Sequence, residues 1–599
     1  MRLAEFEPLT EAEQAVIAGL GTGHVTVLGD GELPGEDAGE DRQVRASLIR
    51  WLALGAPGEH SVRLHEKGLR IAGALVVDER KPDFSQFDWQ MPGLNLEGCV
   101  LPHDLFLCFS FFQHTPVLQG ATLQSLYLGG SHFPGLDAER LNANGLVSLL
   151  DVTSKGETLL SHARLTAGLN CFRGKFENGG SSALTADGLV TESGADLVSA
   201  HVEGETSFIL ADIGGDLNCT DATFDNAKGD AFSADRLTVE GDFFLNSIQA
   251  YGKVRLPGAR IGGNLSCGGG HFENVGKTAL HVDDARVKGA FFWQEGSRAV
   301  GAIHLTAAEI GHINDDPACW PGRGDLLLDR CRYGAFTGTG VSGAERIRWL
   351  DLQAPARFGK DFWPQPWEQC AKVLREMGHA EDARQVLIAK EERQRRVKCE
   401  GAAARLSQIR KRIEKVDRKA PANDIDARLA ARSGLVGAWL QLAVLRLRDG
   451  ALGALIAYGH RPLRALWWLA GLWIFGAVLF GVAYGDGGFK PNNAFILAKE
   501  EWAQCEARSE RLGDPSLTLS CWQEKDAAKG YPAFNPLLYS LHTLVPVVDL
   551  EVQDYWVPDE RAAAWARFFL WVHIGMGWFL ALLAVAGFSG LVQTKATEE

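Results

Sequence analysis

Histidine and cysteine side chains that could bind a metal ion are scattered between residues 304 and 331. They are His304, His312, Cys319 and Cys331. Zinc sites usually place their ligands in short pairs, such as two cysteines separated by two residues, which brings both sulfur atoms to one ion. The spacing here is irregular, so we interpret these four residues as structural. The sequence predicts no metal site and no bound cofactor.

A dinucleotide cofactor would need a glycine-rich turn between a strand and a helix. The nearest candidate is GLGTGHVTVLGDG, Gly19 to Gly31, but its glycine spacing is wrong and it leads into the strand-like HVTVL. The sequence also contains no C-x-x-C pair, no C-x-x-C-H haem motif and no iron–sulfur spacing. No residue can be assigned a catalytic role, and these patterns weigh against a redox enzyme.

The stretch YSLHTLVPVVDL, Tyr539 to Leu550, has the position of a pore loop because it lies shortly before the last apolar segment. A potassium filter needs glycine-rich backbone whose carbonyls face the ion, whereas here Pro546 follows the short helix and no glycine is present. A pore for another cation in a homo-oligomer is one alternative, and a segment packing on the membrane surface is the other. Such a pore or re-entrant segment would use Tyr539, Ser540, Thr543, Pro546, Asp549 and Glu551.

Two stretches of the chain are long and apolar enough to cross a membrane. They run from Ala465 to Tyr484 and from Phe568 to Val592, and neither contains a fixed charge. A bilayer core needs about 20 predominantly apolar residues in a helix. The sequence therefore predicts transmembrane helices at 464–485 and 567–593, with membrane lipids as partners.

Basic residues beside these stretches predict their orientation, because Lys and Arg near a span tend to remain in the cytosol. Four precede the first span and one follows the second: Arg446, Arg448, Arg461, Arg464 and Lys595. Of these, Arg461 and Arg464 would lie closest to the membrane. The first residues contain acids and lack the apolar stretch of a signal peptide. We therefore expect both termini in the cytosol and residues 486–566 outside it.

The segment between the two spans contains two cysteines, Cys505 and Cys521. If this segment lies in an oxidising compartment, the two thiols can form a disulfide, and closing a loop of this length is worth roughly 3 kcal/mol. We predict that they are joined. The other nine cysteines fall on the predicted cytosolic side and should be reduced.

The composition limits the classes of function that remain. The chain has 599 residues and a formal net charge of −15. This length fits several domains, and the acidic balance argues against a nucleic-acid binder, which would present a basic face to phosphates.

An internal repeat predicts the fold of the N-terminal region. The segments starting GLNCFRGKFEN at Gly168, DLNCTDATFDN at Asp216 and NLSCGGGHFEN at Asn264 align at a spacing of 48 residues. Alternating apolar residues and frequent glycines favour short strands over helices, and a fixed period is typical of a solenoid. We predict a mostly β protein, a right-handed parallel β-helix in which each repeat forms two coils of about 24 residues.

Repeated residues occupy equivalent places in this predicted solenoid. Cysteine, phenylalanine and asparagine recur in register at Cys171, Cys219 and Cys267, at Phe176, Phe224 and Phe272, and at Asn178, Asn226 and Asn274. Two coils of separation place successive thiols roughly 10 Å apart, too far for one zinc ion, so we interpret the rows as interior packing and turn ladders. Asp235 and Asp283 share a position in the same way and are expected to form an acidic stripe.

Helical segments are expected on both sides of the solenoid. We assign residues 1–60 to an N-terminal helical cap, 61–345 to the β-helix and 346–460 to a helical hairpin with juxtamembrane helices. The hairpin, Trp363 to Arg396, should break at Gly378, and an apolar segment interrupted by arginines, Leu435 to Gly450, predicts an interfacial helix. The remaining parts are the span 464–485, the external loop 486–566 and the span 567–593.

The order of these segments resembles a known family. The solenoid is followed by QPWEQCAKVLREMGHAEDARQVLIAKE, YGHRPLRALWW and YPAFNPLLYSLHTLVPVVDL, and then by the last span. This order is similar to bacterial membrane-bound pentapeptide-repeat-like proteins with a two-helix C-terminal module, some of which carry the label membrane-associated oxidoreductase. The resemblance implies a multi-pass protein of the bacterial cytoplasmic (inner) membrane.

Three functions are consistent with these features. The first is a membrane-anchored cytosolic β-solenoid that acts as an interaction scaffold or sensor and binds a protein partner. The second is an oligomeric channel-like protein with a non-potassium pore loop. The third is the oxidoreductase that the resemblance implies.

Overall fold

The computed structural model describes residues 2–58, 62–78, 92–419, 425–461, 463–545, 547 and 549–588. The chain divides into two compact units, Met1–Val386 and Leu387–Glu599, which we describe separately. The first unit contains a parallel β-solenoid of about 10 turns, so the predicted fold class is confirmed. The second unit is helical and includes two apolar helices.

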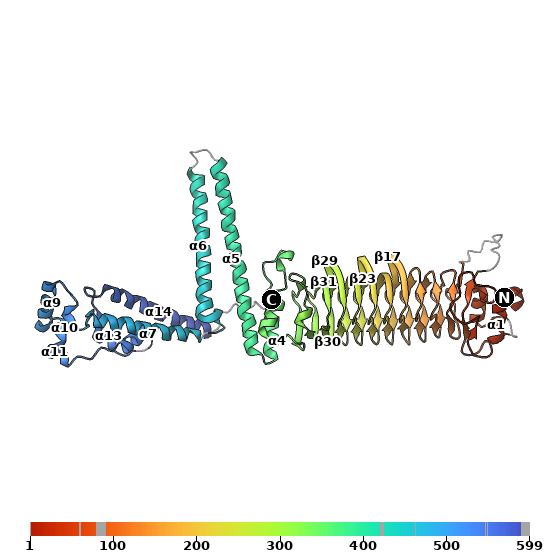
Figure 1. Cartoon of the computed structure of the whole chain (residues 1–599), viewed down its shortest axis with the longest axis horizontal. Coiled ribbons are helices and arrows are strands. Elements are labelled where there is room, and N and C mark those ends of the chain that lie inside the picture. Colours follow the sequence, from red (N-terminus) through yellow and green to blue (C-terminus); the bar gives the residue numbers. More distant parts are fainter. Residues whose placement is uncertain are drawn as a thin grey trace. The chain divides into compact units, whose positions relative to one another are not determined.

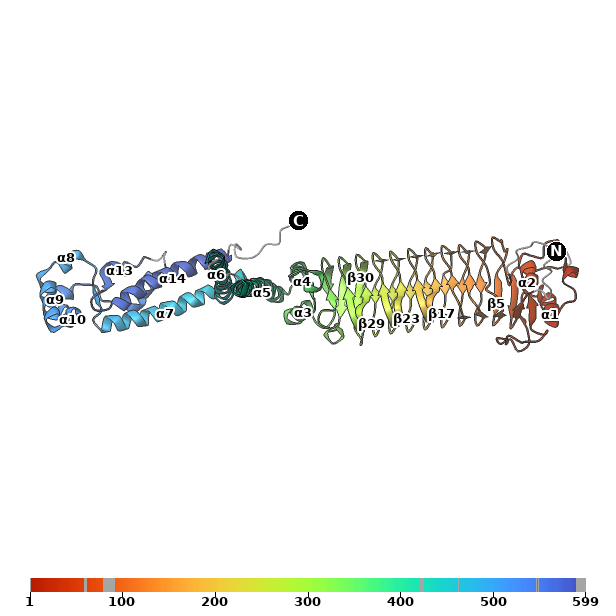
Figure 2. The same cartoon turned by 90° about the horizontal axis from the view of Figure 1, so that it is seen from above.

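The strands of the first unit pair in parallel along two long sheets, and Figure 2 shows the successive coils stacked as a ladder. Early coils have strands of two to four residues, such as β3 (Leu69–Ala72), β5 (Leu105–Cys108), β8 (Leu126–Tyr127) and β16 (Leu169–Asn170). Later strands are longer: β17 (Lys175–Thr185), β20 (His201–Ser207), β23 (Thr223–Ser233), β26 (Gln249–Arg255), β29 (His271–His281), β30 (Arg286–Trp293), β31 (Arg298–His304), β32 (Glu309–Asp315) and β34 (Arg332–Phe336).

The register explains the 48-residue repeat. Leu169 pairs with Ala195, 26 residues on, and Ala195 pairs with Leu217, 22 residues on. The same alternation continues through Phe243 to Leu265. Each repeat is therefore two coils of unequal length, because the longer coil contains an extra loop that the shorter one lacks.

The extra loop lies within β17, β23 and β29, the strands that project on one side of the solenoid in Figure 1. In each loop an asparagine side chain donates a hydrogen bond to the carbonyl four residues ahead, at 2.7 to 2.8 Å. The donors are Asn178, Asn226 and Asn274. The asparagine row thus closes turns, as predicted.

The repeated cysteines and phenylalanines fill the interior. Cys171, Cys219 and Cys267 are fully buried. They alternate with the coils that contain Leu197 and Leu245, since Cys171 N–H bonds to Asp196 O and Leu197 N–H to Asn218 O. Burial raises the pKa of all three thiols far above the ordinary value, so they act as small apolar residues.

An N-terminal cap covers the first coil, but it is not purely helical. It contains α1 (Glu11–Gly19) and α2 (Ala46–Ala53). It also contributes β1 (Thr26–Val27) and β2 (Gln43–Arg45), which pair with β3 and with β4 (Leu75–Val77). The two sheets therefore start before residue 61.

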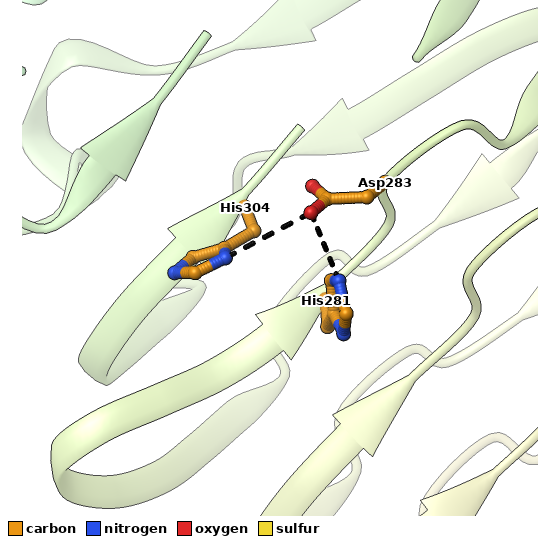
Figure 3. Close-up of side chains that lie close together, drawn as sticks. All are labelled: His281, Asp283 and His304. Atoms are coloured by element: carbon orange, nitrogen blue, oxygen red, sulfur yellow. Dashed lines mark hydrogen bonds and ion pairs between the residues drawn. The ribbon is translucent and has the colours of Figure 1, made fainter. Parts of the chain in front are cut away.

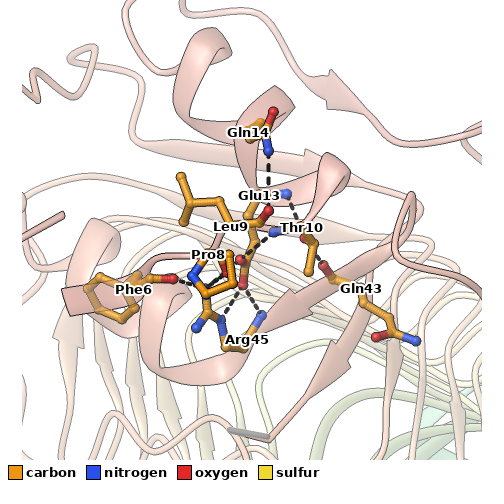
Figure 4. Close-up of polar contacts among 8 residues, drawn as sticks. All are labelled: Phe6, Pro8, Leu9, Thr10, Glu13, Gln14, Gln43 and Arg45. Atoms are coloured by element: carbon orange, nitrogen blue, oxygen red, sulfur yellow. Dashed lines mark hydrogen bonds and ion pairs between the residues drawn. The ribbon is translucent and has the colours of Figure 1, made fainter. Parts of the chain in front are cut away.

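A buried ion pair fastens this cap (Figure 4). The Glu13 carboxylate accepts hydrogen bonds from Arg45 Nε at 2.8 Å and from Arg45 Nη2 at 2.7 Å, and Glu13 also forms a capping box with Thr10. Burial would raise the pKa of Glu13, but the bonds from Arg45 and Thr10 outweigh it and lower that pKa. The pair joins the first helix to the first long-range strand.

A C-terminal cap covers the last coil. It consists of α3 (Gly343–Leu350) and α4 (Gln365–Glu376), followed after the predicted break at Gly378 by α5 (Ala380–Lys419). On α4, Gln365 and Gln369 donate side-chain hydrogen bonds to carbonyls of the final coil, at 3.1 and 2.8 Å. These bonds satisfy backbone acceptors that would otherwise lack a partner at the end of a solenoid.

The second unit continues α5 and adds α6 (Ile425–Ile456), which includes the predicted interfacial segment. The two apolar helices are α7 (Arg464–Gly485) and α14 (Ala564–Phe588). Between them lie β35 (Phe489–Pro491), β36 (Trp556–Pro558) and six short helices: α8 (Ala494–Leu497), α9 (Glu500–Leu512), α10 (Leu517–Gln523), α11 (Asp526–Lys529), α12 (Pro536–Leu544) and α13 (Val552–Tyr555). The end of the second predicted span and Lys595 lie outside the described residues.

Candidate functional site

The apolar helices α7 and α14 are long and apolar enough to cross a membrane. Only 22% of the residues in the most apolar part of each helix are buried. A core helix of a soluble protein would bury most of them. The large apolar side chains left exposed include Trp467, Ile474, Phe475 and Val478 on α7 and Phe568, Trp571, Trp578, Leu582 and Val585 on α14.

The predicted pore segment begins with α12, which packs against both apolar helices. Its polar side chains point into this contact. Ser540 Oγ donates to the carbonyl of Trp473 on α7 at 2.8 Å and lies 3.2 Å from His573 Nε2 on α14. Thr543 Oγ1 donates to the carbonyl of Tyr539 at 2.9 Å. Within one chain these hydroxyls therefore connect helices.

Two glycines allow this close packing. A β-carbon at Gly577 on α14 would lie 1.8 Å from the carbonyl oxygen of Leu544, the last residue of α12. A β-carbon at Gly476 on α7 would lie 2.5 Å from Ser540 Oγ. Small residues at these contacts let helix backbones approach one another, as is common between membrane helices.

The acidic residues of the predicted pore mouth follow α12 and are exposed. The Asp549 carboxylate lies 3.6 Å from His542 Nδ1 and accepts a hydrogen bond from Glu551 N–H at 2.9 Å. Pro546 lies outside the described residues. One chain thus presents Asp549 and Glu551 on its surface, separate from the buried Ser540 and Thr543.

The predicted external loop is a folded cap. Cys505 on α9 and Cys521 on α10 form a disulfide with their Cα atoms 5.7 Å apart. Around it Trp502, Trp522 and Trp556 belong to one buried aromatic cluster. Trp556 is therefore part of a core, and it is not the membrane-surface anchor that its position beside α13 suggests.

A polar cavity of about 380 Å³ opens in this cap. Its charged groups already pair with one another: Arg561 with Glu506 and Glu510 at 2.8 and 3.1 Å, and Lys490 with Asp559 at 3.2 Å. The cavity offers no uncompensated charge to a ligand.

The predicted membrane-proximal arginines lie at the start of α7. Arg464 is its first residue and is exposed, and Arg461 is half-buried. Nearby, the Arg395 guanidinium of α5 lies 4.7 Å from the centre of the Tyr458 ring and 3.8 Å from the Asp449 carboxylate. Basic side chains therefore gather where α5, α6 and α7 meet.

A separate polar cluster lies at a corner of the solenoid (Figure 3). His281 ends β29 and His304 ends β31, and the two residues pair in adjacent coils. Asp283 lies two residues beyond His281. Its Oδ2 atom is 2.9 Å from His281 Nε2 and 4.0 Å from His304 Nδ1, so one carboxylate faces two imidazoles.

Neighbouring groups hold this cluster in place. Asp283 Oδ1 accepts a hydrogen bond from Thr306 N–H at 2.8 Å, and His304 Nε2 lies 3.1 Å from Thr278 Oγ1. Burial would raise the pKa of Asp283, but His281 and Thr306 lower it. Burial lowers the pKa of His304, with a contribution from Lys253 and Arg357. At neutral pH the site therefore combines a carboxylate with a neutral His304.

The sequence prediction for this region was only partly informative. His304 does not gather with His312, Cys319 and Cys331 in a group of potential metal ligands within the part of the chain that the structure describes. It gathers instead with His281 and Asp283. The signal was present, because Asp283 was recognised as the repeat partner of Asp235, but the position of His304 depends on the length of the intervening coil.

No protein-family model matches this chain, and searches of curated proteins and of solved structures found no match.

Proposed function

We propose that this chain is a membrane-anchored β-solenoid that acts as an interaction scaffold or sensor at the bacterial inner membrane. The observation that carries the proposal is the exposure of large apolar side chains along α7 and α14. In water such surfaces would be costly, at about 25 cal/mol per Å² of apolar area. A bilayer removes that cost, and two spans joined by a folded cap make a stable anchor.

The solenoid supplies the interaction part of this proposal. Its interior is filled by stacked apolar residues, and its outer positions alternate with them along each strand. A stacked solenoid is stiff because every coil contacts its neighbours, and it offers long surfaces for a protein partner. The oxidoreductase alternative rests on the resemblance alone, so we do not adopt it.

The topology can be tested with the protein's own cysteines. In intact spheroplasts, a membrane-impermeant maleimide should modify Cys505 and Cys521 only after treatment with an impermeant reductant, because the two are joined and face outward. Cys399 on α5, a half-buried free thiol, should react only after the membrane is permeabilised, because it faces the cytosol.

Peptide mapping assigns each modified cysteine, and a Cys399→Ser variant confirms the assignment of the internal signal. Labelling of Cys399 in intact spheroplasts would reverse the proposed orientation. Alkylation of Cys505 and Cys521 without reductant would show that the cap is not closed by a disulfide.

A channel is the second candidate, favoured by the packing of α12 against both apolar helices. Two spans per chain cannot enclose a pore, so a channel must oligomerise. Native mass measurement of the protein in lipid discs distinguishes the two functions. We expect a monomer or dimer for an anchored scaffold, whereas a closed ring of four or more chains would favour a pore that includes Asp549 and Glu551.

A further inference from the structure

We infer that the corner formed by His281, Asp283 and His304 is a binding site for a divalent transition-metal ion such as Zn²⁺. The inference concerns the first unit alone and does not depend on the proposed membrane anchor. Among the described residues, it is the one group of three or more His, Cys, Asp or Glu whose ligand atoms all lie within 4.8 Å of one another.

The distances are close to those that a metal requires. Zinc bonds of about 2.0–2.1 Å in a tetrahedral site place ligand atoms about 3.4 Å apart. His281 Nε2 and Asp283 Oδ2 are 2.9 Å apart, and His304 Nδ1 is 4.0 Å from the same oxygen. Small rotations of the two imidazole rings can therefore bring three ligands to one ion.

The ligand set has the chemistry of such a site. Two imidazoles and a carboxylate suit Zn²⁺ and neighbouring first-row metals better than Mg²⁺ or Ca²⁺, which prefer oxygen atoms alone. The three side chains are 19 to 25% exposed, so an ion can enter from solvent and a water molecule can complete its coordination. Three protein ligands with an open fourth position are a known zinc arrangement.

Second contacts orient the ligands toward the same point. When the Thr278 hydroxyl accepts from Nε2–H of His304, the lone pair of that ring lies on Nδ1, the atom nearest Asp283. The Thr306 amide holds the Asp283 oxygen on the other side. Outer hydrogen bonds of this kind fix the ring and carboxylate of metal ligands in place.

The same corner in the preceding repeats shows what a purely structural version looks like. Asp187 accepts a hydrogen bond from Ser207 Oγ at 2.5 Å. Asp235 pairs with the Arg255 guanidinium, with Nε at 2.9 Å. A hydroxyl or a guanidinium is enough to fasten the corner aspartate, and neither combination holds a cation. In the third repeat two imidazoles take these places.

This comparison supplies a variant that should fold. The double substitution His281→Ser and His304→Arg copies the preceding corner, in which Ser233 and Arg255 pair with each other's coil around Asp235. It keeps an ion pair for Asp283 and removes both imidazoles. His271→Ala is the matched control, because His271 lies on the same strand beside Glu273 at 3.2 Å but outside the three-residue group.

The experiment uses the full-length, untagged protein in lipid discs, freed of metal with a chelator and then titrated with Zn²⁺ by calorimetry. We expect one Zn²⁺ per chain bound at micromolar concentration or tighter by the wild type and by His271→Ala. The double variant should lose this binding at least 100-fold. Co²⁺ in place of Zn²⁺ should give the visible absorption of a four-coordinate ion in the first two proteins only.

The inference fails if the double variant binds Zn²⁺ as tightly as the wild type, or if the wild type binds none. Asp283→Asn provides a second test should the double variant be poorly folded, because an amide keeps the size of the side chain and weakens metal binding. Equal Zn²⁺ affinity of Asp283→Asn and the wild type would likewise overturn the assignment. Circular dichroism checks that each variant retains the solenoid.

Discussion

Replacing Arg346 with alanine is expected to lower the free energy of unfolding of the solenoid's C-terminal end by about 3–5 kcal/mol. Arg346 on α3 is fully buried and forms two hydrogen bonds with the buried carboxylate of Asp315, at 2.9 and 2.7 Å. Its guanidinium also lies 3.7 Å from the centre of the Phe336 ring. Removing it leaves Asp315 charged and buried, with a single remaining side-chain donor in Trp320 at 2.8 Å.

Hydrogen exchange of β32 and α3, together with thermal unfolding in lipid discs, measures this effect. Arg348→Ala is the matched control on the same helix. That side chain is 69% exposed and lies 4.0 Å from Glu345, and such surface pairs contribute at most about 1 kcal/mol. Equal losses of stability for the two variants would contradict the importance of the buried pair. Conversion of Arg346 to Met should cost less if Asp315 is changed to an apolar residue at the same time.

Replacing Gly577 with alanine should destabilise the packing of α12 on the apolar helices by roughly 1–3 kcal/mol. The added β-carbon would lie 1.8 Å from the Leu544 carbonyl oxygen. Backbone cannot rotate away as a side chain can, so α12 or α14 must shift. The contacts that depend on this seat, including the one between Ser540 and His573 at 3.2 Å, should weaken with it.

Gly575→Ala is the control, because a β-carbon at Gly575 meets no atom within 4 Å. The two glycines lie on one helix, so both substitutions have the same intrinsic helix preference. We expect Gly575→Ala to leave the melting temperature in lipid discs unchanged or slightly raised, and Gly577→Ala to lower it and to speed hydrogen exchange in α12. Indistinguishable variants would show that α12 does not pack on α14 as closely as described.

Local patterns in the sequence were sufficient for several elements. The apolar run predicted at 464–485 coincides with α7, because helix length and hydropathy are properties of a continuous segment. The glycine at 378 separates two helices as expected, with a backbone φ of 91° that favours glycine. The 48-residue repeat predicted the solenoid, since each repeat carries its own strand and turn residues.

Other features depended on which coils lie next to each other. The repeat gives the sum of two coil lengths, but pairing Leu169 with Ala195 and Ala195 with Leu217 divides that sum into 26 and 22 residues. This division places His304 directly beside His281, whereas an equal division would shift the register and turn side chains to other faces. Non-glycine corners in left-handed conformation, such as Arg140, Asp151 and His162, likewise carry no residue-type signal.

The sequence by itself determined the class of fold, the two apolar helices and the interior rows of cysteine and phenylalanine, because these follow from periodicity and composition within short segments. Only the tertiary structure decided that Arg346 neutralises Asp315, that Ser540 faces His573, and that three residues from adjacent coils meet at one corner. Such contacts join residues 23 to 33 positions apart. Their formation depends on backbone register and close packing, which no local pattern encodes.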